Sequence, residues 1–162
     1  MVGVFAPAAP MARTLRLTVR TYGREAPHLK HVATFGLIRA RRLAREAGFD
    51  DALFVGEDGL ISEGSLWNIG FLSGDAVVWP RAPMLAGVAQ ALMEKGLAGV
   101  GMAGRTEAVR LDDLGRFDGA FICNSATPAC AVTVIGDRDF AVDAERMSRL
   151  ERAWRAAPLE TI

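Results

Sequence analysis

A regular pattern of apolar and polar positions appears near the N-terminus. From Arg13 to Thr21, the apolar residues Leu15, Leu17 and Val19 alternate with arginine and threonine. Alternation with a period of two is typical of a strand that buries one face. The pattern therefore predicts a strand over these residues.

A helical pattern follows between about Thr34 and Ala47. Its apolar positions, which we expect to be buried, are Leu37, Ala40, Ala44 and Ala47. The opposite face carries Arg39, Arg41, Arg42 and Arg45. Charged residues on one face of an amphipathic helix are usually solvated, so we expect this arginine face to be exposed.

Short apolar runs separated by turn residues make up most of the remaining chain. The strands predicted from these runs are Asp51–Val55, Leu60–Ile61, Trp67–Leu72, Ala76–Trp79, Thr106–Arg110, Gly119–Asn124 and Ala129–Ile135. A tight turn joins Asp51–Val55 to Leu60–Ile61, and another joins Trp67–Leu72 to Ala76–Trp79, so two hairpins are predicted. Helices are predicted over Gly87–Gly96, with Val88, Ala91 and Leu92 buried, and over Asp143–Ala156, with a helical turn over Leu111–Gly115.

Composition restricts the class of protein. The chain has 162 residues, of which 51% are hydrophobic, and its 19 basic residues balance 19 acidic ones. This length and apolar content suffice for one domain, over residues 1–162, with a substantial core. A balanced charge argues against nucleic-acid binding, and no apolar stretch is long enough to span a membrane. We expect a cytoplasmic protein.

Cysteine and lysine are both rare. Cys123 and Cys130 lie in apolar strands, where a thiol is usually buried, and without a Cys/His cluster we expect no metal site. The two lysines are Lys30 and Lys95. Lys95 ends a predicted helix, where a cation is favourable, whereas Lys30 lies between a strand and a helix with a histidine on each side of it in PHLKH. Lys30 is therefore the candidate for chemistry that needs a primary amine.

Several segments in order resemble the class IV pyridoxal-phosphate enzymes, which include branched-chain and D-amino acid aminotransferases and aminodeoxychorismate lyase. After Lys30 and its helix, the resemblance is carried by AREAGFDDALFV, EDGLISEGSLWNIGFL, WPRAPMLAGVAQ and AFICNSATPACAVTVIGD. Together they cover about residues 28–137. The resemblance implies an α+β fold of mixed, mostly antiparallel strands with packed helices. By this resemblance, we expect the chain to correspond to the family's large C-terminal domain alone, with the family's small N-terminal domain absent.

The resemblance also implies a cofactor, partners and a site. Pyridoxal 5′-phosphate would take up an amino group from an amino acid and pass it to a 2-oxo acid, in a homodimer. Lys30 would bind the cofactor and move the substrate's α-proton, and Glu63 would face the pyridine nitrogen. Backbone N–H groups would hold the phosphate at Gly87–Val88 and in the Ser125–Thr127 loop. The implied cofactor-binding residues are Lys30, Phe35, Glu63, Ser65, Asn68, Gly87, Val88, Ser125, Ala126 and Thr127.

The chain departs from the family's pattern at three points. Phe35 stands where the family commonly has a tyrosine that touches the cofactor, and Ala89-Gln90 stands in place of Thr-Arg. The phosphate-binding arginine of the small domain is also missing, although Arg81 is a candidate to replace it. Three alternatives therefore stay open: an aminotransferase, a β-eliminating lyase like aminodeoxychorismate lyase, and a non-catalytic remnant of the fold. In each case we expect weak cofactor binding.

Overall fold

The computed structural model describes residues 14–156. Its strands are β1 (Thr14–Thr21), β2 (Asp51–Val55), β3 (Ile61–Gly64), β4 (Asn68–Ser73), β5 (Ala76–Pro80), β6 (Ala103–Glu107), β7 (Gly119–Asn124), β8 (Thr127–Ile135) and β9 (Arg138–Asp139). Its helices are α1 (Phe35–Glu46), α2 (Val88–Gly96) and α3 (Ala144–Arg155), with short 3-10 helices η1 (Ala98–Val100) and η2 (Leu111–Arg116). The predicted start at Arg13 and the residues after 156 lie outside the described part.

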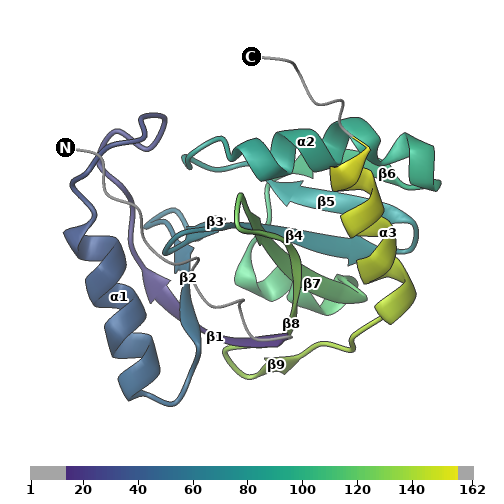
Figure 1. Cartoon of the computed structure of the whole chain (residues 1–162). Helices are drawn as coiled ribbons and strands as arrows, with labels where there is room; N and C mark the ends of the chain where they lie inside the picture. Colours follow the sequence, from purple (N-terminus) through teal and green to yellow (C-terminus); the bar gives the residue numbers. More distant parts are fainter. Residues whose placement is uncertain (1–13, 157–162) are drawn as a thin grey trace.

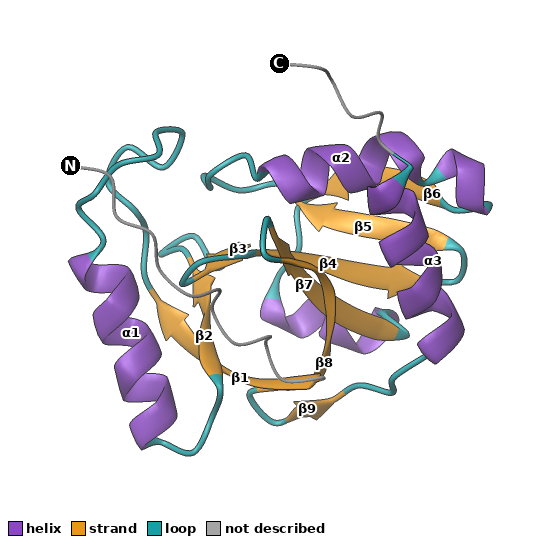
Figure 2. Ribbon diagram, viewed as in Figure 1, coloured by secondary structure: helices purple, strands orange, loops and turns teal. Residues whose placement is uncertain are grey.

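Six strands form a closed ring. Their order is β3-β2-β1-β8-β7-β4, and β3 also pairs with β4, which closes the ring. Strands β5 and β6 extend the sheet beyond β4 (Figure 2). Among the described pairings, β1–β2, β1–β8 and β5–β6 are parallel, and the others are antiparallel. The expected α+β fold of mixed, mostly antiparallel strands is therefore confirmed.

Three apolar clusters hold the elements together. The largest contains side chains from the ring strands, such as Leu17, Ile69 and Val132, and Trp67. A second joins α2 and α3 to β4, β5 and β7, and a third joins α1 to β2. Figure 1 accordingly shows α1 on one side of the ring and α2 with α3 on another.

The predicted hairpins and the first strand agree with the structure. Leu15 and Leu17 are buried in β1, and β2 pairs with β3 and β4 with β5 in antiparallel fashion. The predicted strand Thr106–Arg110 was displaced, since β6 spans Ala103–Glu107. Its residues are almost all exposed, so β6 has no apolar alternation to reveal it. It is placed instead by parallel pairing with β5.

The buried face of α2 was predicted wrongly. Ala89, Met93 and Gly96 are buried, whereas Val88 is 65% exposed. The cause is close packing against α3: a side chain on Gly96 would overlap the backbone of Ala153. Ala47, which follows the last residue of α1, is exposed rather than buried, and Arg41 of α1 is half-buried because it pairs with the buried carboxylate of Asp51 at 3.4 Å. The other three arginines of that face are exposed, as expected.

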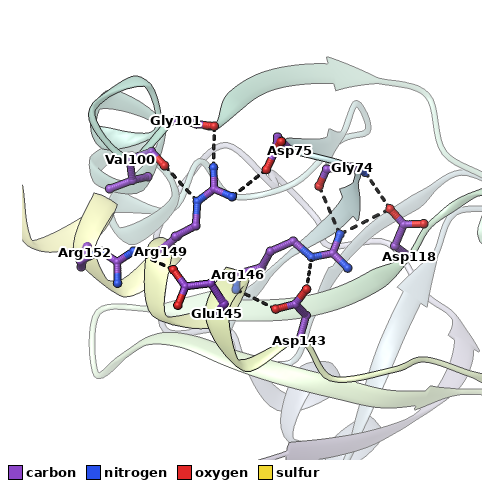
Figure 3. A network of polar contacts seen from close by, with 10 residues as sticks. All are labelled: Gly74, Asp75, Val100, Gly101, Asp118, Asp143, Glu145, Arg146, Arg149 and Arg152. Atoms are coloured by element: carbon purple, nitrogen blue, oxygen red, sulfur yellow. Dashed lines mark hydrogen bonds and ion pairs between the residues drawn. The ribbon is translucent and has the colours of Figure 1, made fainter.

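Helix α3 is fixed to the sheet by two arginines (Figure 3). Arg149 donates to the carbonyl oxygens of Val100 and Gly101 and to the carboxylate of Asp75. Arg146 binds Asp143 and Asp118, and Asp118 in turn accepts from the backbone N–H of Gly74. These contacts hold the β4–β5 turn against α3.

Both cysteines are buried, as expected. Burial raises the pKa of the Cys123 thiol to about 12 and that of Cys130 to about 11. In residues 14–156, no helix combines the length and the apolar character needed to cross a membrane. Within the same residues, no group of three or more His, Cys, Asp or Glu side chains is arranged to hold a metal ion.

Candidate active site

A cavity of about 280 Å³ opens where four connecting segments meet at one end of the strand ring. These segments are the β1–α1 connection, the β3–β4 turn, the segment before α2, and the β7–β8 turn. Figure 1 shows the connections before α1 and before α2 on opposite sides of this end of the ring. Lys30 and Glu63, the two predicted catalytic residues, both line the cavity.

Lys30 is an exposed residue in the β1–α1 connection, five residues before Phe35, the first residue of α1. Two side chains shape this connection. Arg24 donates from Nη2 to the carbonyl oxygen of Leu29 at 3.1 Å. The His31 ring contacts the carbonyl of Glu25 through Nε2 and accepts from the N–H of Ala33 through Nδ1. This assignment implies the neutral tautomer with the proton on Nε2.

Glu63 is buried, and its side chain is 7% exposed. Oε2 accepts from the N–H of Leu85, and Oε1 lies 3.5 Å from Nη1 of Arg24 but accepts no hydrogen bond. Burial raises the pKa of Glu63, and the charge of Arg24, the Leu85 N–H and the charge of Lys30 oppose that rise. The carboxylate therefore has one buried oxygen available to a hydrogen-bond donor in the cavity.

Asn68 lies opposite Glu63 in the pairing of β3 with β4. Its Nδ2 donates to the carbonyl of Leu85 at 2.9 Å, while Glu63 receives the N–H of the same residue. The two side chains thus hold both backbone polar groups of Leu85. Gly87 comes two residues later, and a side chain there would overlap Oδ1 of Asn68. These contacts fix the segment that leads into α2.

The first turn of α2 lines the cavity with Gly87, Val88 and Ala89. Gly87 is the N-cap in an extended conformation, and no side chain caps the helix or carries a negative charge in its first turn. The N–H groups of a first helical turn have no partner within the helix, and the helix dipole favours an anion there. This end of the cavity is suited to bind a phosphate group.

Asp51 anchors the β3–β4 turn through hydrogen bonds from two side chains of that turn. It is 1% exposed, and its Oδ2 accepts from Oγ of Ser65 at 2.8 Å and from Nε1 of Trp67 at 3.0 Å. Arg41 of α1 lies against the same oxygen. Ser65 and Trp67 line the cavity, and the Ser65 hydroxyl donates its hydrogen bond to Asp51.

The β7–β8 turn is tighter than the predicted loop. Asn124 Oδ1 accepts from the N–H groups of Ala126 and Thr127, and its Nδ2 donates to the carbonyl of Leu66. Thr127 is already part of β8. Of the predicted loop residues, Ser125 lines the cavity together with Asn124, while Ala126 and Thr127 lie outside it.

Phe35 also lies apart from the cavity. It is the first residue of α1 and is 81% exposed. Arg81 is turned toward β6, where its Nη2 donates to the carbonyl of Thr106. The structure therefore brings together Lys30, Glu63, Ser65, Asn68, Gly87, Val88 and Ser125.

Sequence reasoning did not find Arg24, Asp51 or Asn124. Arg24 lines the cavity with a side chain that is only 6% exposed, although arginine is seldom buried. Arg24 is one of many arginines in the sequence, so composition gave no signal for it. Its position six residues before Lys30 is the one local signal that points to the site.

Residues 3–135 match the amino-transferase class IV family over most of the chain. The chain belongs to this family. The chain has no significant match among curated protein sequences. The expected family membership is thus confirmed by the match to the family as a whole.

Solved structures share the fold of the class IV chain. A fold IV-transaminase from Curtobacterium pusillum has a TM-score of 0.77 at 24% identity, covering 86% of this chain and 51% of that one. A hypothetical aminotransferase from Mycobacterium tuberculosis in a PLP-bound form has a TM-score of 0.79 at 20% identity, with coverages of 88% and 55%. A putative 4-amino-4-deoxychorismate lyase from Legionella pneumophila has a TM-score of 0.78 at 22% identity, with coverages of 85% and 53%. The chain spans about half the length of these structures.

Class IV aminotransferases bind pyridoxal phosphate, and the residues of this cavity fit that group. The buried Oε1 of Glu63 lacks a hydrogen-bond partner, as a site for a protonated ring nitrogen requires. The uncapped first turn of α2 offers N–H groups to a phosphate. Lys30 supplies a primary amine in the same cavity.

Proposed function

We propose that this chain carries the cofactor-binding half of a pyridoxal-phosphate-dependent aminotransferase, which transfers an amino group between an amino acid and a 2-oxo acid. The observation that carries the proposal is the buried Glu63 carboxylate in the same cavity as Lys30; its Oε1 lies 3.5 Å from Nη1 of Arg24 but accepts no hydrogen bond. Of the two lysines in the sequence, Lys95 lies in the last turn of α2 and has no part in the cavity lining.

The bound cofactor would supply an electron sink for the substrate's α-carbon. Lys30 would accept the proton from that carbon and return it as a general base and acid. Glu63 would hold a proton at the pyridine nitrogen, because an ionised carboxylate favours the protonated ring. The N–H groups at Gly87–Ala89 would orient the phosphate, and Trp67 would close the cavity wall against water.

The proposal is tested by adding pyridoxal 5′-phosphate to the purified chain and reducing with borohydride. We expect a visible absorption band before reduction and a stable label on Lys30 after it, located by peptide mapping. Lys95 is the control within the same molecule. A label on Lys95, or on neither lysine, would show that the cavity does not serve this chemistry.

A lyase that carries out a β-elimination is the second candidate, because the TM-score of 0.78 with the putative 4-amino-4-deoxychorismate lyase is close to the 0.77 with the fold IV-transaminase. Both reactions use an amine and a ring-nitrogen carboxylate. Product analysis separates them: a transaminase converts an added 2-oxo acid into its amino acid, whereas a lyase releases a product without an amino acceptor. Labelling of Lys30 with neither product would favour a non-catalytic form.

We also propose that the functional protein is a homodimer. Large apolar side chains of the β1–α1 connection and of the first turns of α1 and α2 are exposed, including Val32 at 98%, Phe35 at 81% and Val88 at 65%. Exposed apolar side chains that lie together often mark association surfaces. Sedimentation of the chain, compared with a Phe35→Ser variant, tests the proposal, and we expect a dimer that the variant weakens. A monomer at all concentrations would refute it.

A further inference from the structure

Arg24 contacts the surroundings of both predicted catalytic groups. Its Nη2 donates to the carbonyl of Leu29, and that carbonyl carbon is bonded to the backbone nitrogen of Lys30. Its Nη1 lies 3.5 Å from Oε1 of Glu63. One guanidinium therefore connects the backbone beside the amine to the carboxylate.

The environment of Arg24 is unusual for a structural arginine. Its side chain is 6% exposed, that of Glu63 is 7% exposed, and both line the cavity. Its Nε is buried and has no hydrogen-bond partner. A buried charge is costly unless it is paired, so this arginine and this carboxylate stabilise each other's charged forms.

Glu63 faces few other groups that could keep it charged. Apart from Arg24, the Leu85 N–H and the charge of Lys30 lower its pKa, and burial raises it above the ordinary value. Arg24 is the largest of the opposing influences. Reaction with a carbonyl compound would convert the Lys30 amine into an imine with release of water, whereas Arg24 would remain a fixed cation beside Glu63.

We propose that Arg24 is the positioning residue of the site: its two terminal nitrogens set the place of Lys30 relative to Glu63 and stabilise the ionised form of the Glu63 carboxylate. This inference rests on the proposed function, since it assumes that these two groups act together. The proposed role of Arg24 requires the forked guanidinium group, because the two contacts use different nitrogens. A lysine in this position would keep the charge and lose one contact.

The variants that test the proposal are Arg24→Met, which removes the charge and the fork, and Arg24→Lys, which removes the fork alone. Arg42→Met is the matched control, because Arg42 is an exposed residue of α1 that pairs with Glu46. All are studied as the chain without cofactor. The first measurement is the titration of the Glu63 carboxyl by carbon NMR, with its signal assigned by its loss in Glu63→Gln.

In Arg24→Met, we expect the Glu63 titration to move to higher pH, and in Arg24→Lys to stay near that of the unaltered chain. The second measurement is hydrogen exchange at the N–H groups of Leu29 and Ala33. We expect exchange roughly tenfold faster or more in both Arg24 variants, since a hydrogen bond from a charged donor is lost. Arg42→Met should change neither quantity.

An unchanged Glu63 titration in Arg24→Met, or unchanged exchange in Arg24→Lys, would overturn the proposal. If Arg24→Met does not fold, Arg24→Lys still tests whether the forked guanidinium is needed. A shifted Glu63 titration in Arg24→Lys would contradict the proposal that a positive charge at residue 24 is enough to stabilise the ionised carboxylate. Borohydride labelling of Lys30 in the unaltered chain is scored separately. Failure of that labelling removes the proposed function, whereas the cofactor-free measurements report on Arg24 alone.

Discussion

The amide of Asn68 occupies the space that a side chain on Gly87 would need. A Cβ at Gly87 would overlap Oδ1 of Asn68, whose Nδ2 meanwhile binds the carbonyl of Leu85. Glycine at this position therefore serves the close approach of a neighbouring side chain, since the Gly87 backbone itself is extended and open to any residue. The start of α2 depends on this contact.

We expect Gly87→Ala to displace the Asn68 amide and break its bond to Leu85. Loss of a partly buried hydrogen bond with local strain should cost about 1–3 kcal/mol in the free energy of unfolding. Urea denaturation measures this quantity. In an Asn68→Ala background the same substitution should cost much less, because the overlap is gone. Strictly additive costs in the double variant would contradict the contact.

We expect Asp51→Ala to lower the free energy of unfolding by about 2–4 kcal/mol, because the buried donors of Ser65 and Trp67 lose their acceptor. The Trp67 emission should also shift, since its indole N–H loses its partner. Asp137, an exposed residue, gives the control variant Asp137→Ala. Equal losses in the two variants would show that Asp51 does not hold the turn.

Acid should weaken the attachment of α3 to the sheet. Hydrogen bonds from the Gly74 N–H and from Arg146 lower the pKa of Asp118, and those from the Arg146 N–H and side chain lower the pKa of Asp143. A carboxyl group with a lowered pKa in the folded state stabilises the fold fully at pH values above the ordinary aspartate pKa, near 3.8. This stabilisation is lost as the pH falls through the lowered pKa.

The check is the thermal midpoint measured from pH 6 down to pH about 2.5 for the unaltered chain and for Arg146→Met. The variant should be less stable at neutral pH and lose less on acidification, because its aspartates have lost the arginine that holds them ionised (Figure 3). Parallel curves for the two proteins would exclude this linkage.

The two thiols should be unreactive in the folded chain. With pKa values of about 12 for Cys123 and about 11 for Cys130, almost no thiolate exists at pH 8, and both side chains are buried. A chromogenic disulfide reagent should report two thiols only after denaturation. Rapid reaction of either thiol in the native chain would disprove their burial.

Apolar periodicity accounts for the parts of the fold that were predicted correctly. Leu15 and Leu17 alternate with arginine and threonine in β1, and the turns after β2 and β4 contain glycine and aspartate where the hairpins need them. Strand β6 was displaced because its residues are exposed and its place is set by pairing with β5. Gly96 is the last residue of α2, as predicted, and its close contact with the α3 backbone could not be read from the sequence.

The sequence pattern predicted only some of the residues of the candidate site. Lys30 and Glu63 were identified through rarity, spacing and family resemblance, and both line the cavity. Arg24 and Asp51 were missed because their importance comes from burial and from partners distant in sequence, such as Glu63 and Trp67. No local pattern encodes such a contact, since it depends on the closure of the strand ring.

The ring of strands closes beside the cavity, where Glu63 pairs with Asn68. Glu63, which we propose for chemistry, therefore also joins the first half of the ring to the second. A substitution of Glu63 would alter the proposed chemistry and folding together, so a loss of activity in such a variant would have two sources. Evolution of a new substrate preference should proceed more readily in the β7–β8 turn, which borders the same cavity without closing the ring.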